Sequence, residues 1–216
     1  MKVVAVVSGG MDSVCFLAQH DLDECHVLAF DYGQKGVKEL SVIENVVAGF
    51  PFVQDVQIID MSFMQELWPG SQLTDEAVDI EDNYVPTVVV PLRNMVMLTI
   101  AAAYAKSIGA GKIIFGAHAD DAAGYPDCRN GFVAELQKTL NTGHPDNPLT
   151  IDSPARCGFS KAENLKRAHA LVGDIIFNTW SCYRSEKLHC GVCESCRNRK
   201  KAIALAGLQD KTEYEG

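Results

Sequence analysis

The chain has 216 residues, a length that suits one domain with a full hydrophobic core and a small appendage. Apolar residues make up 47% of it, charged residues 22%, and the formal net charge is −9. These values argue against a broad nucleic-acid surface, and no apolar run approaches the roughly 20 residues of a membrane-spanning helix. The start of the sequence lacks the features of a secretion signal, so we expect a soluble, cytoplasmic protein with small-molecule or protein partners.

Short apolar runs, rich in Val and Ile, alternate along the chain with segments of helical periodicity. The apolar runs predict buried strands at residues 3–7, 26–31, 56–61, 88–91, 112–117 and 149–151. The periodic segments predict helices at residues 13–20, 38–50, 93–109 and 131–141. Residues 62–86 interrupt the alternation with a Trp-Pro-Gly turn and an acidic stretch, which predicts an excursion from the fold.

The helix expected at 93–109 has the clearest pattern. We expect it to end at Gly109 and to place Val96, Ile100, Ala103 and Ser107 on one side. The alternation favours an α/β fold in which a parallel sheet carries helices on both faces. Ligands of such sheets bind beyond the carboxyl ends of the strands, so the loops at those ends are the candidate sites.

The first of these loops follows the strand at 3–7. Its candidate nucleotide-binding residues are Ser8, Gly9, Gly10, Met11, Asp12 and Ser13. Glycines let backbone N–H groups approach a phosphate, hydroxyls add donors, and the following helix directs its positive end at the same point. A Gly-Gly turn with Asp12 or Ser13 as a helix cap is the alternative. The order of residues resembles the pyrophosphatase loop of ATP enzymes that release AMP and pyrophosphate, which implies that Asp12 helps to hold Mg²⁺.

Four of the eight cysteines lie close together near the C-terminus. They are Cys182, Cys190, Cys193 and Cys196. Four thiolates fill a tetrahedral Zn²⁺ site without an open position, which predicts a structural zinc in a segment spanning 180–206. Buried free thiols and an iron–sulfur cluster are the alternatives. Cys15 and Cys25 are expected in the core.

Two further stretches follow predicted strands. Tyr125, Asp127 and Arg129 offer a ring, a carboxylate and a guanidinium that suit a flat heterocycle with donor edges. A Pro-containing turn in which Asp127 caps the next helix is the alternative. Arg93 begins the helix at 93–109, where it either meets a phosphate or is an ordinary surface residue.

These stretches, together with Phe30-Asp31-Tyr32-Gly33-Gln34, Lys161-Ala162-Glu163 and the Cys cluster, occur in the order seen in 7-cyano-7-deazaguanine synthases. The chain resembles this family over nearly its whole length. The resemblance implies a Rossmann-like parallel sheet of the adenine-nucleotide α-hydrolase (ATP pyrophosphatase) type, with one domain over 1–216. It also implies ATP, Mg²⁺ and Zn²⁺ as cofactors, and a homodimer.

The activity that the resemblance implies is ATP-dependent ligation. The family converts 7-carboxy-7-deazaguanine and ammonia to 7-cyano-7-deazaguanine through adenylated intermediates. The implied catalytic residues are Asp12, Arg93 and Lys161, and the implied substrate-binding residues are Tyr125, Asp127 and Arg129. Lys161 has the alternative of an ordinary residue in the first turn of a helix.

The sequence departs from the family pattern near the expected substrate pocket. Gln34-Lys35-Gly36 stands where Gln-Arg-His is common, Ala122-Ala123 replaces an aromatic-containing pair, and residues 153–160 are one residue longer than usual. These departures put the acceptor in question. One alternative is a ligase of an antiviral system that attaches an amide-linked deazaguanine to the N-terminus of a partner protein. A non-catalytic nucleotide-sensing module is another, against which the intact Ser8, Asp12 and Asp127 argue.

Overall fold

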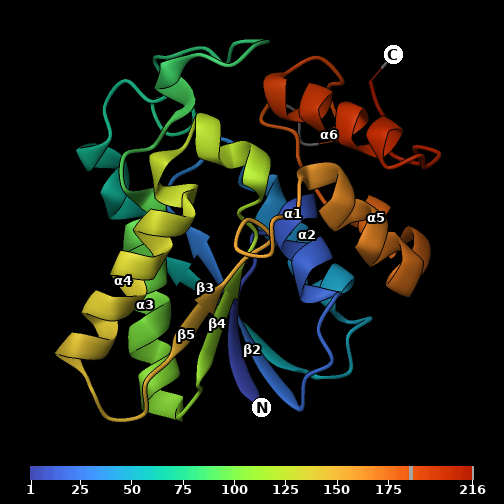
Figure 1. The fold of residues 1–216 in the computed structure, drawn as a ribbon. Helices are drawn as coiled ribbons and strands as arrows, with labels where there is room; N and C mark the ends of the chain where they lie inside the picture. Colours follow the sequence, from blue (N-terminus) through green and yellow to red (C-terminus); the bar gives the residue numbers. More distant parts are fainter. Residues whose placement is uncertain (185–186, 216) are drawn as a thin grey trace.

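The structure is a computed structural model that describes residues 1–184 and 187–215. Five strands form one sheet in the order β3-β2-β1-β4-β5 (Figure 1), and every neighbouring pair is parallel. The strands are β1 (Lys2–Val6), β2 (Glu24–Asp31), β3 (Val53–Asp60), β4 (Lys112–Phe115) and β5 (Thr150–Asp152). The predicted parallel α/β sheet is confirmed.

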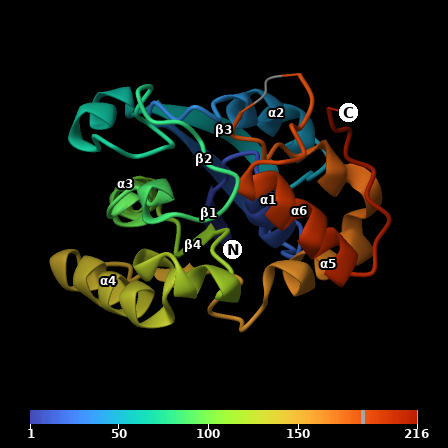
Figure 2. The same cartoon turned by 90° about the horizontal axis from the view of Figure 1, so that it is seen from above.

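Six α-helices cover the sheet in the described part of the chain. They are α1 (Met11–Leu17), α2 (Lys38–Val47), α3 (Arg93–Ile108), α4 (Asn130–Gly143), α5 (Lys161–Val172) and α6 (Glu194–Leu205). Helices α3 and α4 lie on one face, and α1, α2 and α5 lie on the other, with α6 beside α5 (Figures 1 and 2). Each face holds its own cluster of buried apolar side chains.

Burial on both faces explains why β1 is a continuous apolar run. Successive side chains of a strand point to opposite faces. Val3 and Ala5 therefore belong to the cluster under α1, α2 and α5, whereas Val4 belongs to the cluster under α3. All three are fully buried. Such a strand lacks the apolar–polar alternation of a half-exposed one.

The strand order places a topological switch point between β1 and β4. The chain adds β2 and β3 on one side of β1, and then β4 and β5 on the other. Loops that leave β1 and β4 diverge to opposite faces, which opens a crevice where ligands bind in such sheets. The two loops approach closely, because a Cβ on Gly116, after β4, would lie only 2.6 Å from the backbone nitrogen of Ser13.

One predicted strand is wrong. Residues 88–91 form no strand; a 3₁₀ turn at Pro86–Val88 is followed by irregular backbone. Val88 and Val90 are nevertheless buried, at 3% and 5% exposure, in the cluster under α3. A short apolar run predicts burial but not backbone pairing, and Pro86 and Pro91 lack the N–H groups that a strand donates.

The predicted side of α3 is wrong in part: Val96 and Ile100 are half-buried and pack against the apolar cluster, and the bounds of the helix and its stop at Gly109 are confirmed. The buried side consists of Met97, Leu98, Ala101, Ala102 and Ala105. Ala103 and Ser107 are exposed. The stretch Pro86–Ile108 is long and apolar enough to cross a membrane, but α3 packs on β1 and β4 and contributes to the core. This is the position of a core helix.

The remaining expectations about elements have mixed outcomes. The predicted excursion at 62–86 is confirmed, since it contains only the 3₁₀ turn Ser62–Leu67 before Pro86. Helices α5 and α6 were not among the predicted elements. Cys15 and Cys25 are buried in the core, as expected. The division into one domain over 1–216 with a zinc segment at 180–206 stays a prediction, and residues 185–186 of that segment lie outside the described residues.

Candidate active site and metal centre

The loop between β1 and α1 turns sharply at Gly9. Its φ of +83° lies in the left-handed region, and a Cβ there would lie 2.0 Å from the carbonyl oxygen of Glu39. The Gly10 N–H donates to Ser8 Oγ at 3.2 Å, and Ser13 Oγ donates to the Gly10 carbonyl at 3.2 Å. The six predicted nucleotide-binding residues therefore form one compact turn at the switch point, although the side chain of Met11 is buried in the core.

Asp12 lies in the first turn of α1 and contacts Lys161. The Lys161 Nζ donates to Asp12 Oδ2 at 2.6 Å. The other oxygen, Oδ1, is buried and has no hydrogen-bond partner among the described residues. Burial alone raises the pKa of Asp12, but the positive charges of Lys161 and His118 outweigh it and hold the pKa below its ordinary value. An ionised carboxylate with one unshared oxygen suits a divalent cation.

Lys161 is the first residue of α5. The helix begins with a capping box, in which the Ser160 side chain accepts from the Glu163 N–H and the Glu163 carboxylate accepts from the Ser160 N–H. The Lys161 N–H donates to Asp120 Oδ2 at 2.9 Å. Lys161 is thus a first-turn helix residue that also contacts Asp12 in the loop of residues 8–13, called the phosphate loop below, and its catalytic role stays a prediction. Its pairing with Asp12 raises the pKa of Lys161 in spite of its burial.

Two further ionisable residues, His118 and Asp121, lie beside the Asp12–Lys161 pair and were not among the residues singled out from the sequence. His118 follows β4 and is 5% exposed. Its Nε2 lies 3.3 Å from Asp121 Oδ1 and 3.8 Å from Asp12 Oδ1. Burial raises the pKa of Asp121. Their position in the sequence could have indicated them, because both residues follow a predicted strand and so lie at the same sheet edge as the phosphate loop.

Arg93 starts α3 and reaches the end of β2. One terminal nitrogen donates to the Tyr32 hydroxyl at 3.1 Å, and the guanidinium carbon lies 5.6 Å from the centre of the Tyr32 ring. The preceding residue, Leu92, has a φ of 57°, which is unusual for a residue with a Cβ. The structure therefore holds Arg93 at the carboxyl edge of the sheet rather than on an open surface.

The three predicted substrate-binding residues lie between β4 and α4. Asp127 accepts hydrogen bonds from the backbone and side-chain nitrogens of Asn94, at 3.0 and 3.3 Å. It therefore caps α3 and not the next helix along the chain. Arg129 is exposed and donates to the carbonyl of Ala122 at 2.8 Å, and Tyr125 is half-buried. Their role in substrate binding stays a prediction.

The four clustered cysteines come together in space. Their sulfur atoms all lie within 4.8 Å of one another, and Cys190 Sγ is 3.9 Å from Cys196 Sγ. Tetrahedral zinc with Zn–S bonds of about 2.3 Å requires sulfurs about 3.8 Å apart, so the arrangement fits this metal. Cys182, Cys193 and Cys196 are buried, which suits a structural centre closed to water. Cys193 also precedes the first residue of α6.

Comparison with known proteins decides the family. Residues 2–207 match the family described as queuosine biosynthesis protein QueC. The chain belongs to the QueC family. A 7-cyano-7-deazaguanine synthase from Chlorobaculum parvum is 38% identical over 224 residues, and one from Clostridium kluyveri is 35% identical over 227 residues. Each alignment covers 100% of this chain, with 97% and 98% of the two relatives. The resemblance seen in the motifs is confirmed.

Among solved structures, a 4-thiouridine synthetase–RNA complex with bound ATP gives a TM-score of 0.48 at 17% identity, over 95% of this chain and 50% of that chain.

Two departures from the QueC pattern have visible consequences in the fold. The Lys35 ammonium donates to the carbonyl of Val78. It therefore links the turn after β2 to the excursion at residues 62–86 and does not extend toward the phosphate loop. At Gly36 a Cβ would lie 3.5 Å from the carbonyl oxygen of Cys182. A Cβ at this distance is an ordinary contact, and the turn after β2 lies beside residues 180–206, which carry the clustered cysteines and are called the metal segment below.

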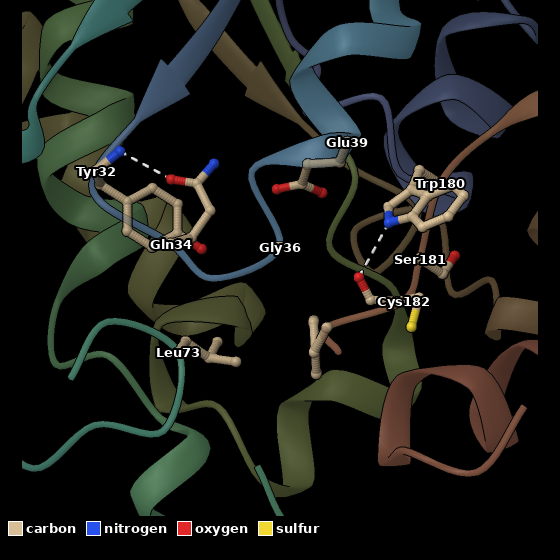
Figure 3. Close-up of a pocket in the computed structure, with 9 residues that line it drawn as sticks. Tyr32, Gln34, Gly36, Glu39, Leu73, Trp180, Ser181 and Cys182 are labelled. Atoms are coloured by element: carbon tan, nitrogen blue, oxygen red, sulfur yellow. Dashed lines mark hydrogen bonds between the residues drawn. The ribbon is translucent and has the colours of Figure 1, made fainter. Parts of the chain in front are cut away.

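A pocket lies where this turn, the start of α2, the excursion and the metal segment meet (Figure 3). It is lined by Tyr32, Gln34, Gly36, Glu39, Leu73, Trp180, Ser181, Cys182 and Tyr183. Glu39 accepts hydrogen bonds from the side chains of Ser8 and Gln34. Burial raises the pKa of Glu39 to about 7, against the opposing effect of the Arg93 guanidinium. Sequence analysis missed Glu39, because nothing in its local pattern distinguishes it from a surface helix residue.

The metal segment is tied directly to the phosphate loop. The Trp180 N–H donates to the Gly9 carbonyl at 3.0 Å. Arg199, fully buried in α6, donates to Thr179 Oγ1 and Ser181 Oγ, both at 3.0 Å. One helix of the metal segment thus holds both residues that flank Trp180, and through them supports the wall of the pocket.

Proposed function

We propose that this chain is a 7-cyano-7-deazaguanine synthase, an ATP-dependent ligase that converts 7-carboxy-7-deazaguanine and ammonia to 7-cyano-7-deazaguanine. The observation that carries the proposal is its full-length membership of the QueC family, with curated relatives of that name at 35% and 38% identity. The phosphate loop, the Asp12–Lys161 pair and the four-cysteine cluster supply groups that this chemistry needs.

The first step activates a carboxylate, which is a poor electrophile. An oxygen of the substrate carboxylate attacks the α-phosphorus of ATP, the bond to pyrophosphate breaks, and an acyl adenylate forms. The residues Ser8, Gly9, Gly10, Met11 and Ser13 form the loop that holds the pyrophosphate. Asp12 is the residue that would hold Mg²⁺, and this cation supplies charge neutralisation on the phosphates. Lys161 and Arg93 stabilise the remaining negative charge.

Ammonia then displaces AMP to give an amide. A second adenylation, on the amide oxygen, allows AMP to leave again while the nitrogen loses its two protons, which yields the nitrile. Tyr125 and Arg129 contact the planar base in this proposal. Asp127 supports the site through its bonds to Asn94, the residue after Arg93. Each of these assignments rests on position at the sheet edge.

Zinc has a structural role in the proposal. The four sulfurs of the Cys cluster hold it and leave no coordination position for water. The metal thereby fixes the segment that forms one wall of the pocket. We also propose a homodimer, on the resemblance to the family alone.

The test is a product analysis with purified protein, 7-carboxy-7-deazaguanine, Mg-ATP and ammonium chloride. We expect AMP and pyrophosphate as products, with the amide formed first and the nitrile after it. Mass spectrometry detects each of them. ADP as the direct product would contradict attack at the α-phosphorus. Amide without nitrile would instead favour the alternative ligase that attaches an amide-linked deazaguanine to a protein N-terminus. Binding of ATP without any turnover would favour the nucleotide-sensing module.

A further inference from the structure

The pocket beside the phosphate loop is too small for a purine base. Its free volume is about 20 Å³, whereas a single water molecule needs roughly 10–15 Å³ on the same measure. One small molecule therefore fits. Ammonia and ammonium are close to water in size, and the proposed function requires one of them.

The lining of the pocket suits a small cation with N–H donors. Three aromatic side chains, Tyr32, Trp180 and Tyr183, contribute to the wall, and aromatic rings attract cations. Glu39 adds a carboxylate, which accepts hydrogen bonds from N–H groups. In Figure 3 the Glu39 carboxylate points between the side chains of Gln34 and Trp180.

The position of the pocket connects it to the reacting groups. Glu39 bonds to the Ser8 side chain, and its carboxylate oxygen lies 3.5 Å from the place where a Cβ on Gly10 would be. Gly9 packs on the backbone of the same residue. The pocket therefore lies beside the loop proposed to hold the pyrophosphate of ATP.

We propose that this pocket is the ammonium-binding site of the enzyme and that the Glu39 carboxylate accepts the proton that converts ammonium to ammonia. The inference rests on the proposed synthase function. It adds a ligand and a residue that neither the sequence motifs nor the phosphate loop assign.

The step is balanced as follows. NH₄⁺ gives one proton to the Glu39 carboxylate and becomes NH₃. The nitrogen lone pair attacks the acyl carbon, a C–N bond forms, and the bond from that carbon to the phosphate oxygen breaks, so AMP leaves with both electrons. The nitrogen loses one further proton to water, which gives the neutral amide. Glu39 then returns its proton to solvent.

The charges around Glu39 favour this transfer. Arg93 acts on it from the start of α3. The other ionisable groups that line the pocket are Tyr32, directly after β2, and Cys182 and Tyr183 of the metal segment. The Arg93 cation repels NH₄⁺ more than NH₃, which favours the neutral nucleophile once the proton has moved. Burial raises the pKa of Glu39 to about 7, so its carboxyl group exchanges protons near neutral pH.

The experiment compares Glu39→Gln with wild type and with the control Glu44→Gln, which changes an exposed residue of the same helix. ATP–pyrophosphate exchange in the presence of the carboxylic acid reports adenylation, which needs no ammonia. We expect Glu39→Gln to keep this exchange within about threefold of wild type. Its rate of amide formation at limiting ammonium should fall about 10²-fold or more, because a general base is lost. The control should match wild type in both measurements.

Two further measurements isolate the role of the carboxylate. Hydroxylamine is largely neutral at pH 7 and needs no deprotonation, so Glu39→Gln should form the hydroxamate at nearly the wild-type rate. Glu39→Asp keeps the carboxylate and should recover part of the ammonium-dependent rate. Because exchange and hydroxamate formation both require a folded active site, a misfolded variant cannot imitate the expected result.

The opposing outcomes are distinct. The inference is overturned if Glu39→Gln uses ammonium as well as wild type does, or if it loses exchange and amide formation together, since Glu39 would then serve ATP. If the wild-type protein itself shows no exchange with this acid, the proposed function fails, and the ammonium site fails with it.

Discussion

The carboxylate of Asp12 contacts Lys161 with one oxygen and leaves the other without a hydrogen-bond donor among the described residues. A buried acceptor without a partner is costly unless something else binds it. At this sheet edge the bound group is a cation that accompanies the phosphates, in the function proposed above. The same carboxylate thus has a structural partner on one side and a catalytic one on the other.

Replacing Asp12 by Asn should abolish turnover while the protein stays folded. The amide removes the negative charge that would hold Mg²⁺, so we expect kcat to fall about 10²-fold or more. Loss of the ion pair with Lys161 should lower the free energy of unfolding by less than about 2 kcal/mol, since both side chains are partly exposed. Urea unfolding and product analysis check both values.

The matched control is Asp21→Asn, which changes an exposed carboxylate in the segment before β2. It should leave both quantities unchanged. Normal turnover in Asp12→Asn would remove Asp12 from the proposed catalytic residues.

The raised pKa of Glu39 predicts how the free energy of unfolding depends on pH, independently of catalysis. Its pKa is raised from 4.5 to about 7 in the folded state, so between these values the folded protein binds more protons than the unfolded chain. The free energy of unfolding therefore falls as pH rises from about 4.5 to 7. Glu39→Gln removes the buried charge, so the variant should be more stable than wild type at pH 8 by about 1–2 kcal/mol, after allowance for partial exposure.

At pH 4 this gain should disappear, because the wild-type side chain is then protonated in both states. Urea unfolding of both proteins at pH 4 and pH 8 checks the sign. An equal difference between the two proteins at both pH values would contradict a raised pKa of Glu39.

At the level of elements, sequence patterns predicted most of the sheet and the glycine-containing loop after β1. The loop was predictable because residue types and position after a strand act together there. The strand predicted at 88–91 is wrong because its three valines specify burial, and irregular backbone under α3 buries them as well as a strand would. Helix α5 had a usable signal in Ser160 and Glu163, the capping box.

Helix α6 had no comparable signal. Its buried stripe consists of Cys196, Arg199, Ala202 and Ile203. A stripe that contains a fully buried Arg is not recognisable as apolar from sequence. The environment of Glu39 in the candidate site was likewise not predictable from local sequence. Its pKa is raised by burial, to which Trp180 and Ser181 contribute from about 140 residues later in the chain. Tertiary packing, and not local pattern, creates that environment.

The start of α3 supplies a prediction at this level. Asp127→Ala removes the acceptor of both Asn94 bonds, so we expect a loss of about 1–2 kcal/mol in the free energy of unfolding, as for other helix caps. Activity should fall as well, because Arg93 precedes Asn94. Asp127→Asn retains one acceptor oxygen and should recover part of the stability.

Thermal and urea unfolding, measured beside substrate affinity, separate capping from substrate binding. If Asp127→Ala keeps full stability and loses only affinity for the carboxylic acid, Asp127 is a substrate ligand and its capping role is wrong. The exposed Asp146→Ala is a suitable control.

For the whole molecule, the segment that carries the Cys cluster is joined to the start of the chain by the hydrogen bond from Trp180 to Gly9. We expect one zinc per chain by metal analysis. Binding free energy of structural zinc is about 10–16 kcal/mol and is largely folding free energy, so Cys193→Ser should be unstable or insoluble. Soluble protein that lacks zinc and unfolds at the wild-type temperature would contradict a structural metal.

The bond from Trp180 to the Gly9 carbonyl has a consequence for synthesis on the ribosome. The phosphate loop emerges among the first residues, but one wall of the adjoining pocket is only translated after residue 179. A nascent chain can pair β1 with β2 early, yet it holds an incomplete pocket until the cysteines arrive and the metal binds. In the proposed function, ribosome-bound intermediates therefore lack a complete ammonium pocket, and this pocket is the last part of the site to form.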